Sequence, residues 1–126
     1  MKTLLLGISL ASIAFGTNIA LAGGWPASVV GTWHVEANHS TGTLSIMSQG
    51  SGECQPITGT IFGNPMHGFY CPLSGRIHFL RAPGNVTFQD YTGNLSQALA
   101  GVPLLMAGTF ASDNDSFGEY NWNASK

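Results

Sequence analysis

Residues Gly59–Arg81 read GTIFGNPMHGFYCPLSGRIHFLR, and they carry the strongest fold signal of the chain. Two turn signals, Gly63-Asn64-Pro65 and Pro72 to Gly75, interrupt the stretch. The runs around these turns are short and rich in isoleucine, threonine and aromatic residues, which favour strands. The stretch therefore predicts consecutive antiparallel strands joined by tight turns. The strands predicted here are Ile57 to Phe62, Met66 to Cys71 and Arg76 to Arg81.

Runs of the same kind continue on both sides of this stretch. Helix signals are nearly absent, since only Ser96 to Val102 has a helix-forming composition and Pro103 ends it. About eight strands in sequence predict an all-β fold, an eight-stranded antiparallel up-and-down (meander) β-barrel filled by side chains or holding one small ligand. A two-layer β-sandwich is the alternative. The other predicted strands are Val29 to Ala37, Thr41 to Ser48, Val86 to Leu95, Leu104 to Ala111 and Phe117 to Asn123.

The first residues have the pattern of a secretory signal peptide. Met1-Lys2 provides a positive start, Leu4 to Phe15 is apolar, and Ala20-Leu21-Ala22 resembles a cleavage site. The apolar run is too short for a membrane span, which needs about 20 residues. We therefore expect a signal peptide at 1–22, a secreted or periplasmic location, and one β-barrel domain at 23–126.

The charged residues exclude several classes of partner. Beyond the predicted signal peptide the only basic side chains are Arg76, Arg81 and Lys126, so no cluster exists that could displace counterions from nucleic acid. An anionic membrane surface is disfavoured for the same reason. No membrane span is predicted in the mature chain.

The two cysteines of the chain are Cys54 and Cys71. In an exported protein an even pair predicts one disulfide bond, which would stabilise the fold by about 3 kcal/mol. Two free thiols or a pair of metal ligands are the alternatives, although zinc sites usually have closer Cys-x-x-Cys spacing.

Motifs of enzymes, metals and cofactors are missing from the sequence. There is no Gly-x-Ser-x-Gly elbow, phosphate loop or dinucleotide fingerprint. We therefore expect a protein that is not an enzyme and that holds no metal and no cofactor. A small hydrolase using Asp90 or Glu119 is a less favoured hypothesis. The histidines, which lack the spacing of a zinc site, are His34, His39, His67 and His78.

Aromatic and amide side chains provide the candidate binding residues. Tyr120 and Trp122 share one face of the last predicted strand, and Gln89 and Tyr91 share a face of the sixth. Aromatic faces beside amide groups suit a small neutral organic ligand or a sugar. We therefore expect the barrel to bind a small neutral ligand, or another protein, through its open end and loops. The alternative is that these rings fill the barrel. The predicted ligand-binding residues are Tyr70, Gln89, Tyr91, Tyr120 and Trp122.

Protein partners are the second class of hypothesis. A low charge and Thr/Asn-rich strands are compatible with self-assembly into homo-oligomers or surface structures. A secreted protease inhibitor that inserts Gly23-Gly24-Trp25-Pro26 into an enzyme is a related possibility. Asn-x-Ser/Thr triplets, which are glycan acceptors only in a eukaryotic protein, occur at Asn38, Asn85, Asn94, Asn114 and Asn123.

Two motifs resemble those of avidin and streptavidin, within the wider calycin group that includes the lipocalins. Gly31-Thr32-Trp33 is similar to the Gly-x-Trp of the first strand, and Thr58-Gly59-Thr60 to the Thr-Gly-Thr of the third. The resemblance implies an avidin-like β-barrel whose closed end is plugged by Trp33. It implies no catalytic residue. Because Ile61 stands where avidins have a biotin-contacting tyrosine, tight binding of biotin is not expected.

Overall fold

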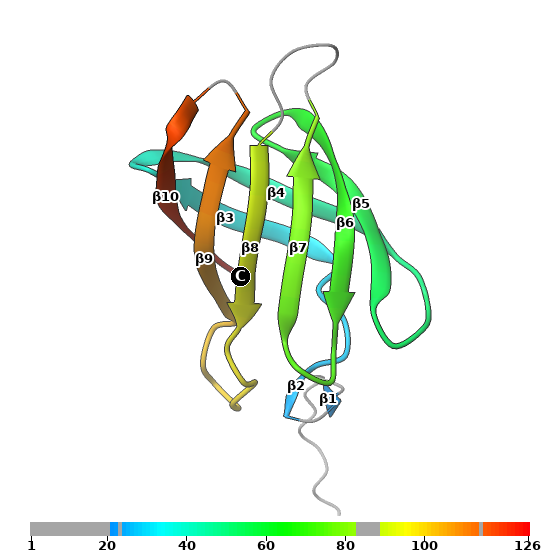
Figure 1. Ribbon diagram of the computed structural model, residues 1–126. Helices are drawn as coiled ribbons and strands as arrows, with labels where there is room; N and C mark the ends of the chain where they lie inside the picture. The colour runs from blue at the N-terminus through cyan, green and yellow to red at the C-terminus, as the bar shows by residue number, and fades with distance from the viewer. Residues whose placement is uncertain (1–20, 23, 83–88, 114) are drawn as a thin grey trace, which may run out of the picture.

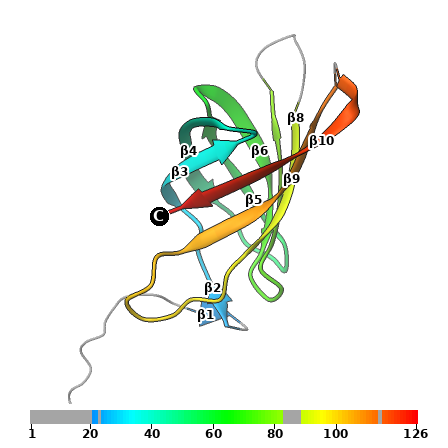
Figure 2. The same ribbon diagram turned by 90° about the vertical axis from the view of Figure 1, so that its left-hand side faces the viewer.

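The computed structural model describes residues 21–22, 24–82, 89–113 and 115–126, which form a barrel with a short two-stranded ribbon below it (Figures 1 and 2). The ribbon consists of β1 (Leu21–Ala22) and β2 (Trp25–Pro26). The barrel strands are β3 (Gly31–Ala37), β4 (Ser40–Gln49), β5 (Gln55–Ile61), β6 (Asn64–Cys71), β7 (Arg76–Arg81), β8 (Gln89–Leu95), β9 (Leu105–Ser112) and β10 (Asp115–Ser125).

The barrel is a meander in which each strand pairs with its neighbour in the chain. The order is β10-β3-β4-β5-β6-β7-β8-β9, and all pairs are antiparallel. The first and last barrel strands close it, with Trp122 opposite Ala37 and Ser125 opposite His34. The predicted eight-stranded up-and-down barrel is thus confirmed, and the sandwich alternative is rejected.

The observed bounds equal the predicted ones for Arg76–Arg81 and differ by one or two residues for the other barrel strands except β8. The first barrel strand begins at Gly31 instead of Val29, because Val29 already packs in the segment that covers the barrel end. The strand predicted from Val86 is described from Gln89, and residues 86–88 lie outside the described part of the chain. Ser96 to Val102 holds one hydrogen-bonded turn and no helix.

Alternation along the strands separates the interior from the surface. Ile77 and Phe79 are buried while His78 between them is exposed, as the sequence pattern of this strand predicts. Burial of the inward-facing apolar side chains is the main favourable term for such a domain. The buried core consists of Val29, Trp33, Val35, Ala37, Leu44, Ile46, Ile57, Ile61, Met66, Tyr70, Ile77, Phe79, Tyr91, Leu95, Met106, Phe110, Trp122 and Ala124.

Four rings form a row across neighbouring strands, which we name the aromatic ladder: Phe79, Tyr91, Phe110 and Tyr120. Each ring lies opposite the next in the strand register. The ring centroids are 4.9 Å apart for the first pair, 4.8 Å for the second and 5.5 Å for the third. Contacts at these distances stabilise aromatic pairs beyond their buried area. The ladder thus connects β7 to β10 through ring contacts between neighbouring strands.

Trp122 packs edge-on against this ladder inside the barrel. Its centroid is 5.6 Å from that of Phe79 and 5.7 Å from that of Tyr91. Gly93 leaves room for the indole, since a Cβ there would lie 2.8 Å from the ring. The indole Nε1–H donates to the carbonyl oxygens of Thr92 and Thr109, so the buried ring has its polar group satisfied.

One end of the barrel is sealed by the segment before β3, and we call it the closed end. Trp33 is fully buried there and donates from Nε1 to the carbonyl of Val29 at 2.9 Å. The Tyr70 hydroxyl donates to the carbonyl of Pro26 at 2.6 Å, and the Trp25 indole donates to the carbonyl of Leu95 at 3.1 Å. Buried donors that are satisfied in this way tie the covering segment to the barrel.

Gln49 holds the same segment through its side-chain amide. Its Oε1 accepts from the backbone N–H of Val29 at 2.8 Å, and its Nε2 donates to the carbonyl of Ala27 at 2.9 Å. The closed end is further held by the predicted disulfide bond between Cys54 and Cys71, which is confirmed. The bond joins the loop between β4 and β5 to the end of β6.

The ribbon includes part of the predicted signal peptide. Leu21 pairs with Pro26 and Ala22 with Trp25, whereas residues 1–20 lie outside the described residues, so the signal peptide and export stay predictions. Within the described ranges no helix has the length and apolar character needed to cross a membrane.

Candidate functional site

The opposite end of the barrel, which we call the open end, contains a cavity. Its volume is ≈ 470 Å³, within the range of ordinary small-molecule sites. The cavity lies where the hairpin turns β3–β4 and β5–β6 meet the ends of β7 to β10. The described residues that line it are Ala37, Asn38, Ser40, Phe62, Arg81, Gln89, Tyr91, Phe110, Ser112 and Tyr120.

Three members of the aromatic ladder form one side of this cavity. Tyr91 lies at its base, where 0% of the residue is exposed, and Phe110 beside it is 6% exposed. Tyr120, on β10, is half-buried and packs against the core from the rim. A ligand that entered the open end would therefore meet the rings of Phe110 and Tyr120, with Tyr91 supporting them from below.

A hydrogen-bonded group of polar side chains forms another part of the lining. The Arg81 guanidinium donates to Asn64 Oδ1 from Nε at 2.8 Å and from Nη2 at 2.5 Å. Its Nη1 donates to Gln89 Oε1 at 3.0 Å, and the Tyr91 hydroxyl donates to the same oxygen at 2.8 Å. Burial raises the pKa of Tyr91, while the charge of Arg81 and its hydrogen bond to the side chain oppose that rise. Tyr91 therefore stays a neutral donor that fixes Gln89.

Phe62 packs against the guanidinium of this group and has an unusual backbone conformation. Its φ is 50°, and Gly63 after it has a φ of 77°, so the two residues form the turn between β5 and β6. A left-handed conformation costs a bulky side chain about 1 kcal/mol or more. The ring compensates through contacts: the Arg81 Cζ lies 5.2 Å from its centroid, and it fills the space above Gly42. Such local strain often accompanies functional positions.

The predicted ligand-binding residues divide between the two ends of the barrel. Gln89, Tyr91 and Tyr120 line the cavity. Tyr70 is buried at the closed end, where its hydroxyl is bonded to Pro26. Trp122 is buried beside the ladder without lining the cavity.

The sequence analysis missed three important lining residues, Arg81, Phe62 and Phe110. Arg81 has the same strand parity as Ile77 and Phe79, so its inward direction could have been found from the alternation that identified them. Many aromatic residues lie in the predicted strands, and nothing in the sequence distinguishes Phe110 from the others as a lining residue. The sequence predicts Phe62 at the end of a strand, whereas it occupies the turn after β5.

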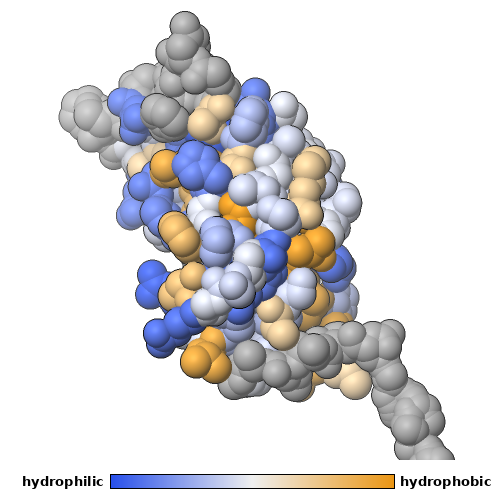
Figure 3. Space-filling model, turned by 90° about the vertical axis from the view of Figure 1, so that its right-hand side faces the viewer, coloured by the Kyte–Doolittle hydropathy of each residue, from blue (hydrophilic) through white to orange (hydrophobic). Residues whose placement is uncertain are grey.

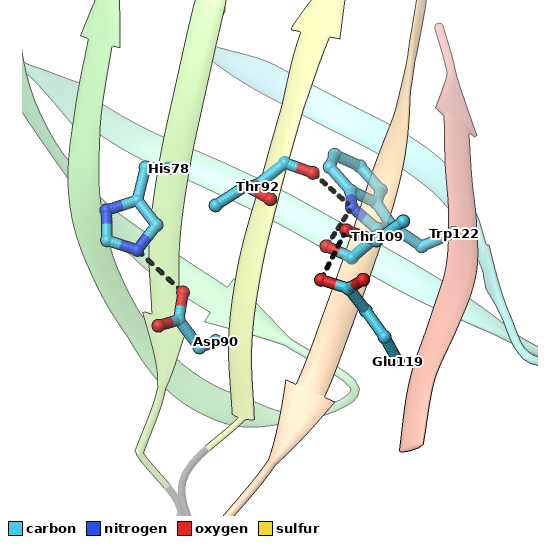
Figure 4. A network of polar contacts seen from close by, with 6 residues as sticks. All are labelled: His78, Asp90, Thr92, Thr109, Glu119 and Trp122. Atoms are coloured by element: carbon cyan, nitrogen blue, oxygen red, sulfur yellow. Dashed lines mark hydrogen bonds and ion pairs between the residues drawn. The ribbon is translucent and has the colours of Figure 1, made fainter. Parts of the chain in front are cut away.

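The residues of the hydrolase hypothesis lie on the outside of the barrel (Figure 4). Asp90 Oδ1 lies 2.6 Å from His78 Nε2, and both side chains are 52% exposed. Glu119 accepts from the Thr109 hydroxyl at 3.3 Å. Asp90 on β8 and Glu119 on β10 are separated by β9, and neither lines a described cavity. The structure therefore does not bring them together in a cleft.

A second, smaller hollow of ≈ 220 Å³ lies on the outside where β10 meets β3. It is lined by the polar side chains of Glu36, Asn38, His39, Asn121 and Asn123. Among the residues that the structure describes, no group of three or more His, Cys, Asp or Glu side chains is arranged to hold a metal ion.

Comparison of the chain with known protein families, with curated proteins and with solved structures finds no significant match in any of the three. A functional assignment for this barrel therefore depends on the geometry of its open end.

Proposed function

We propose that this protein is an exported β-barrel without catalytic activity that binds a small organic ligand in its open end. The observation that carries the proposal is the contrast between a cavity of ≈ 470 Å³ at one end and a sealed opposite end. Eight-stranded barrels of this kind have room for one small ligand. Rings combined with a few fixed polar groups are the usual lining of such sites.

The proposed mode of binding is similar to that of the avidin-type and wider calycin barrels, which the motif around Trp33 resembles. Trp33 lies at the closed end, the position that this resemblance implies. Three of the residues predicted from the sequence also line the cavity and are kept as candidate ligand-binding residues: Gln89, Tyr91 and Tyr120. We add Arg81 and Phe110, which line the same cavity. Tyr70 and Trp122 support the fold in this proposal.

Self-assembly is the competing hypothesis, and two observations weigh against it. Closure of the barrel pairs β10 with β3 over Trp122–Ser125, so an unpaired strand edge for a second copy to extend is limited to short stretches of these two strands. On the face drawn in Figure 3, apolar surface occurs in separate patches between polar ones. A large contiguous apolar patch would be the usual mark of a stable interface.

The inhibitor hypothesis requires an extended arm, whereas Trp25 and Pro26 pack on the closed end. Trp25 is half-buried and hydrogen-bonded to Leu95, and Pro26 is buried. Both contacts would have to break before the arm could enter a protease.

The proposed function is tested with two fluorescent dyes, neutral N-phenyl-1-naphthylamine and anionic 8-anilinonaphthalene-1-sulfonate. We expect saturable binding of at least one dye with one site per chain. Ser40→Trp, which fills the cavity, should abolish it. Thr41→Trp is the matched control, because Thr41 is the next residue on β4 and lies opposite Glu36 on the outside. Absence of saturable binding, or equal binding by both variants, would contradict the proposal.

A further inference from the structure

Arg81 is the one charged side chain among the described residues that line the open-end cavity. It is half-buried, at the end of β7, with its guanidinium above the ring of Phe62. A partly buried charge is usually accompanied by an opposite charge. Among residues 24–82, 89–113 and 118–126, whose side chains the structure describes, no carboxylate lies within ion-pair distance of this guanidinium. Within these ranges the cavity therefore holds a cation without a matching anion.

The neighbouring amides increase the excess of donors. Asn64 Oδ1 and Gln89 Oε1 both face Arg81 and accept from it, so each amide oxygen is occupied. Gln89 Oε1 also accepts from Tyr91, which leaves the NH₂ group of Gln89 without an acceptor among the described residues. The amide orientation follows from this network. The group therefore offers N–H donors to anything that occupies the cavity.

Arg81 itself also retains a donor. A guanidinium has five N–H groups, and the contacts to Asn64 and Gln89 use one each on Nε, Nη1 and Nη2. The hydrogen bond that opposes the rise in the pKa of Tyr91 uses a further one. One N–H of the charged group thus remains for a ligand, and charge-assisted bonds to a carboxylate are about twice as strong as neutral ones.

Neither of the two described carboxylates close to this site in the chain fills the role. Asp90 follows Gln89 directly, but strand alternation directs it to the outside, where it contacts His78. Asp113, after β9, is exposed and is not part of the lining. The side chains that the structure describes therefore supply no anion for Arg81, which a ligand in the cavity could provide.

We infer that the ligand of the open end is a small planar monocarboxylate, an inference that rests on the proposed function. Its carboxylate accepts from Arg81 and from the NH₂ group of Gln89. Its ring or unsaturated body lies against Phe110 and Tyr120, whose centroids are 5.5 Å apart. This replaces the neutral ligand expected from the sequence with an anionic one of the same size class.

The inference is tested by calorimetric titration with 2-naphthoate and 2-naphthamide, which have nearly the same shape and differ in charge. We expect the carboxylate to bind at least about tenfold more tightly, the effect of one charge-assisted hydrogen bond. Arg81→Gln should remove this preference. Arg76→Gln, on the same strand but exposed at the closed end, removes the same charge and should leave the preference unchanged. Arg81→Lys should retain only part of it, because lysine keeps the charge but lacks the planar group that bonds Asn64 and Gln89 at the same time.

The outcomes separate this inference from the proposed function. If the dyes bind and Ser40→Trp blocks them, but naphthoate and naphthamide bind equally, the cavity is a binding site and the carboxylate assignment is wrong. The same conclusion holds if Arg76→Gln reduces the preference as much as Arg81→Gln, because the effect is then one of net charge. If no dye binds, the proposed function fails and the inference fails with it. Retained thermal unfolding of each variant establishes that the changes are local.

Discussion

The two ends of this barrel use similar residue types for different purposes. At the closed end, the polar groups of Trp33, Tyr70 and Gln49 are all bonded to the backbone of the covering segment. At the open end, the polar groups of Arg81 and Gln89 are bonded to one another, and N–H groups of both side chains remain available to a ligand. Aromatic and amide content therefore does not mark a site. What distinguishes the proposed site is that its polar groups are not all used in hydrogen bonds within the described protein.

The two ends should differ most in their contribution to stability. Trp33→Ala should lower the free energy of unfolding by about 3–5 kcal/mol, since it empties a fully buried position and removes the bond to Val29. Tyr120→Ala, at the rim, should cost clearly less while it weakens ligand binding. Denaturant unfolding of both variants measures the difference. Equal losses would mean that the two ends contribute alike to the fold.

Loss of the disulfide bond should have the next greatest effect. Cys54 and Cys71 are 17 residues apart in sequence, and releasing a loop of this size should cost about 3 kcal/mol. The double variant Cys54→Ser/Cys71→Ser, followed by thermal unfolding, tests this. Dye binding at the open end should be kept at temperatures where the variant remains folded. Loss of binding in the folded variant would show that the closed end shapes the cavity.

Tyr70 should make stability depend on pH in the alkaline range. Burial raises its pKa from 10.0 to about 12. Because the folded pKa is the higher one, the unfolded chain releases this proton first, and stability falls as pH rises from about 10 towards 12. The loss should reach about 2 kcal/mol near pH 12. Tyr70→Phe should reduce this alkaline loss by that amount, as followed by urea unfolding at several pH values. An unchanged pH profile in Tyr70→Phe would contradict the assignment.

Substitution of Phe62, the residue with a strained backbone at the open end, should have the smallest effect on the free energy of unfolding. Phe62→Asn relieves the backbone strain at φ 50° but removes the ring contact with Arg81. These changes oppose each other, so the net change should stay within about 1 kcal/mol. Affinity for 2-naphthoate should fall, because the guanidinium loses the ring that holds it. A large loss of stability with unchanged affinity would assign Phe62 to the fold instead of the site.

The fold was predictable because its signals are local. Turn residues such as Gly63-Asn64-Pro65 set the hairpins, and the alternation of Ile77 and Phe79 with polar neighbours set the buried face. The number of strands then favoured closure. The disulfide was expected from an even number of cysteines.

The site was predictable only in part, because alternation defines which face a residue occupies and not its height in the barrel. Tyr70 and Tyr91 both face inward, yet the first lies at the closed end and the second at the base of the cavity. Height depends on strand direction and register, which are set by pairing across the whole barrel. The role of Arg81 depends on Asn64 and Gln89 from neighbouring strands, which no single stretch reveals.

Binding of a carboxylate ligand at the open end, and not elsewhere on the barrel, can be located residue by residue with two-dimensional ¹H–¹⁵N NMR during titration with 2-naphthoate. We predict the largest shifts for the side-chain NH₂ of Gln89 and for the backbone amides of Asn38, Ser40 and Ser112, which line the cavity. The amides of Tyr70 and Leu95 at the closed end should not move. Shifts that concentrate at the closed end, or on the outer wall around His78, would show that the carboxylate binds elsewhere.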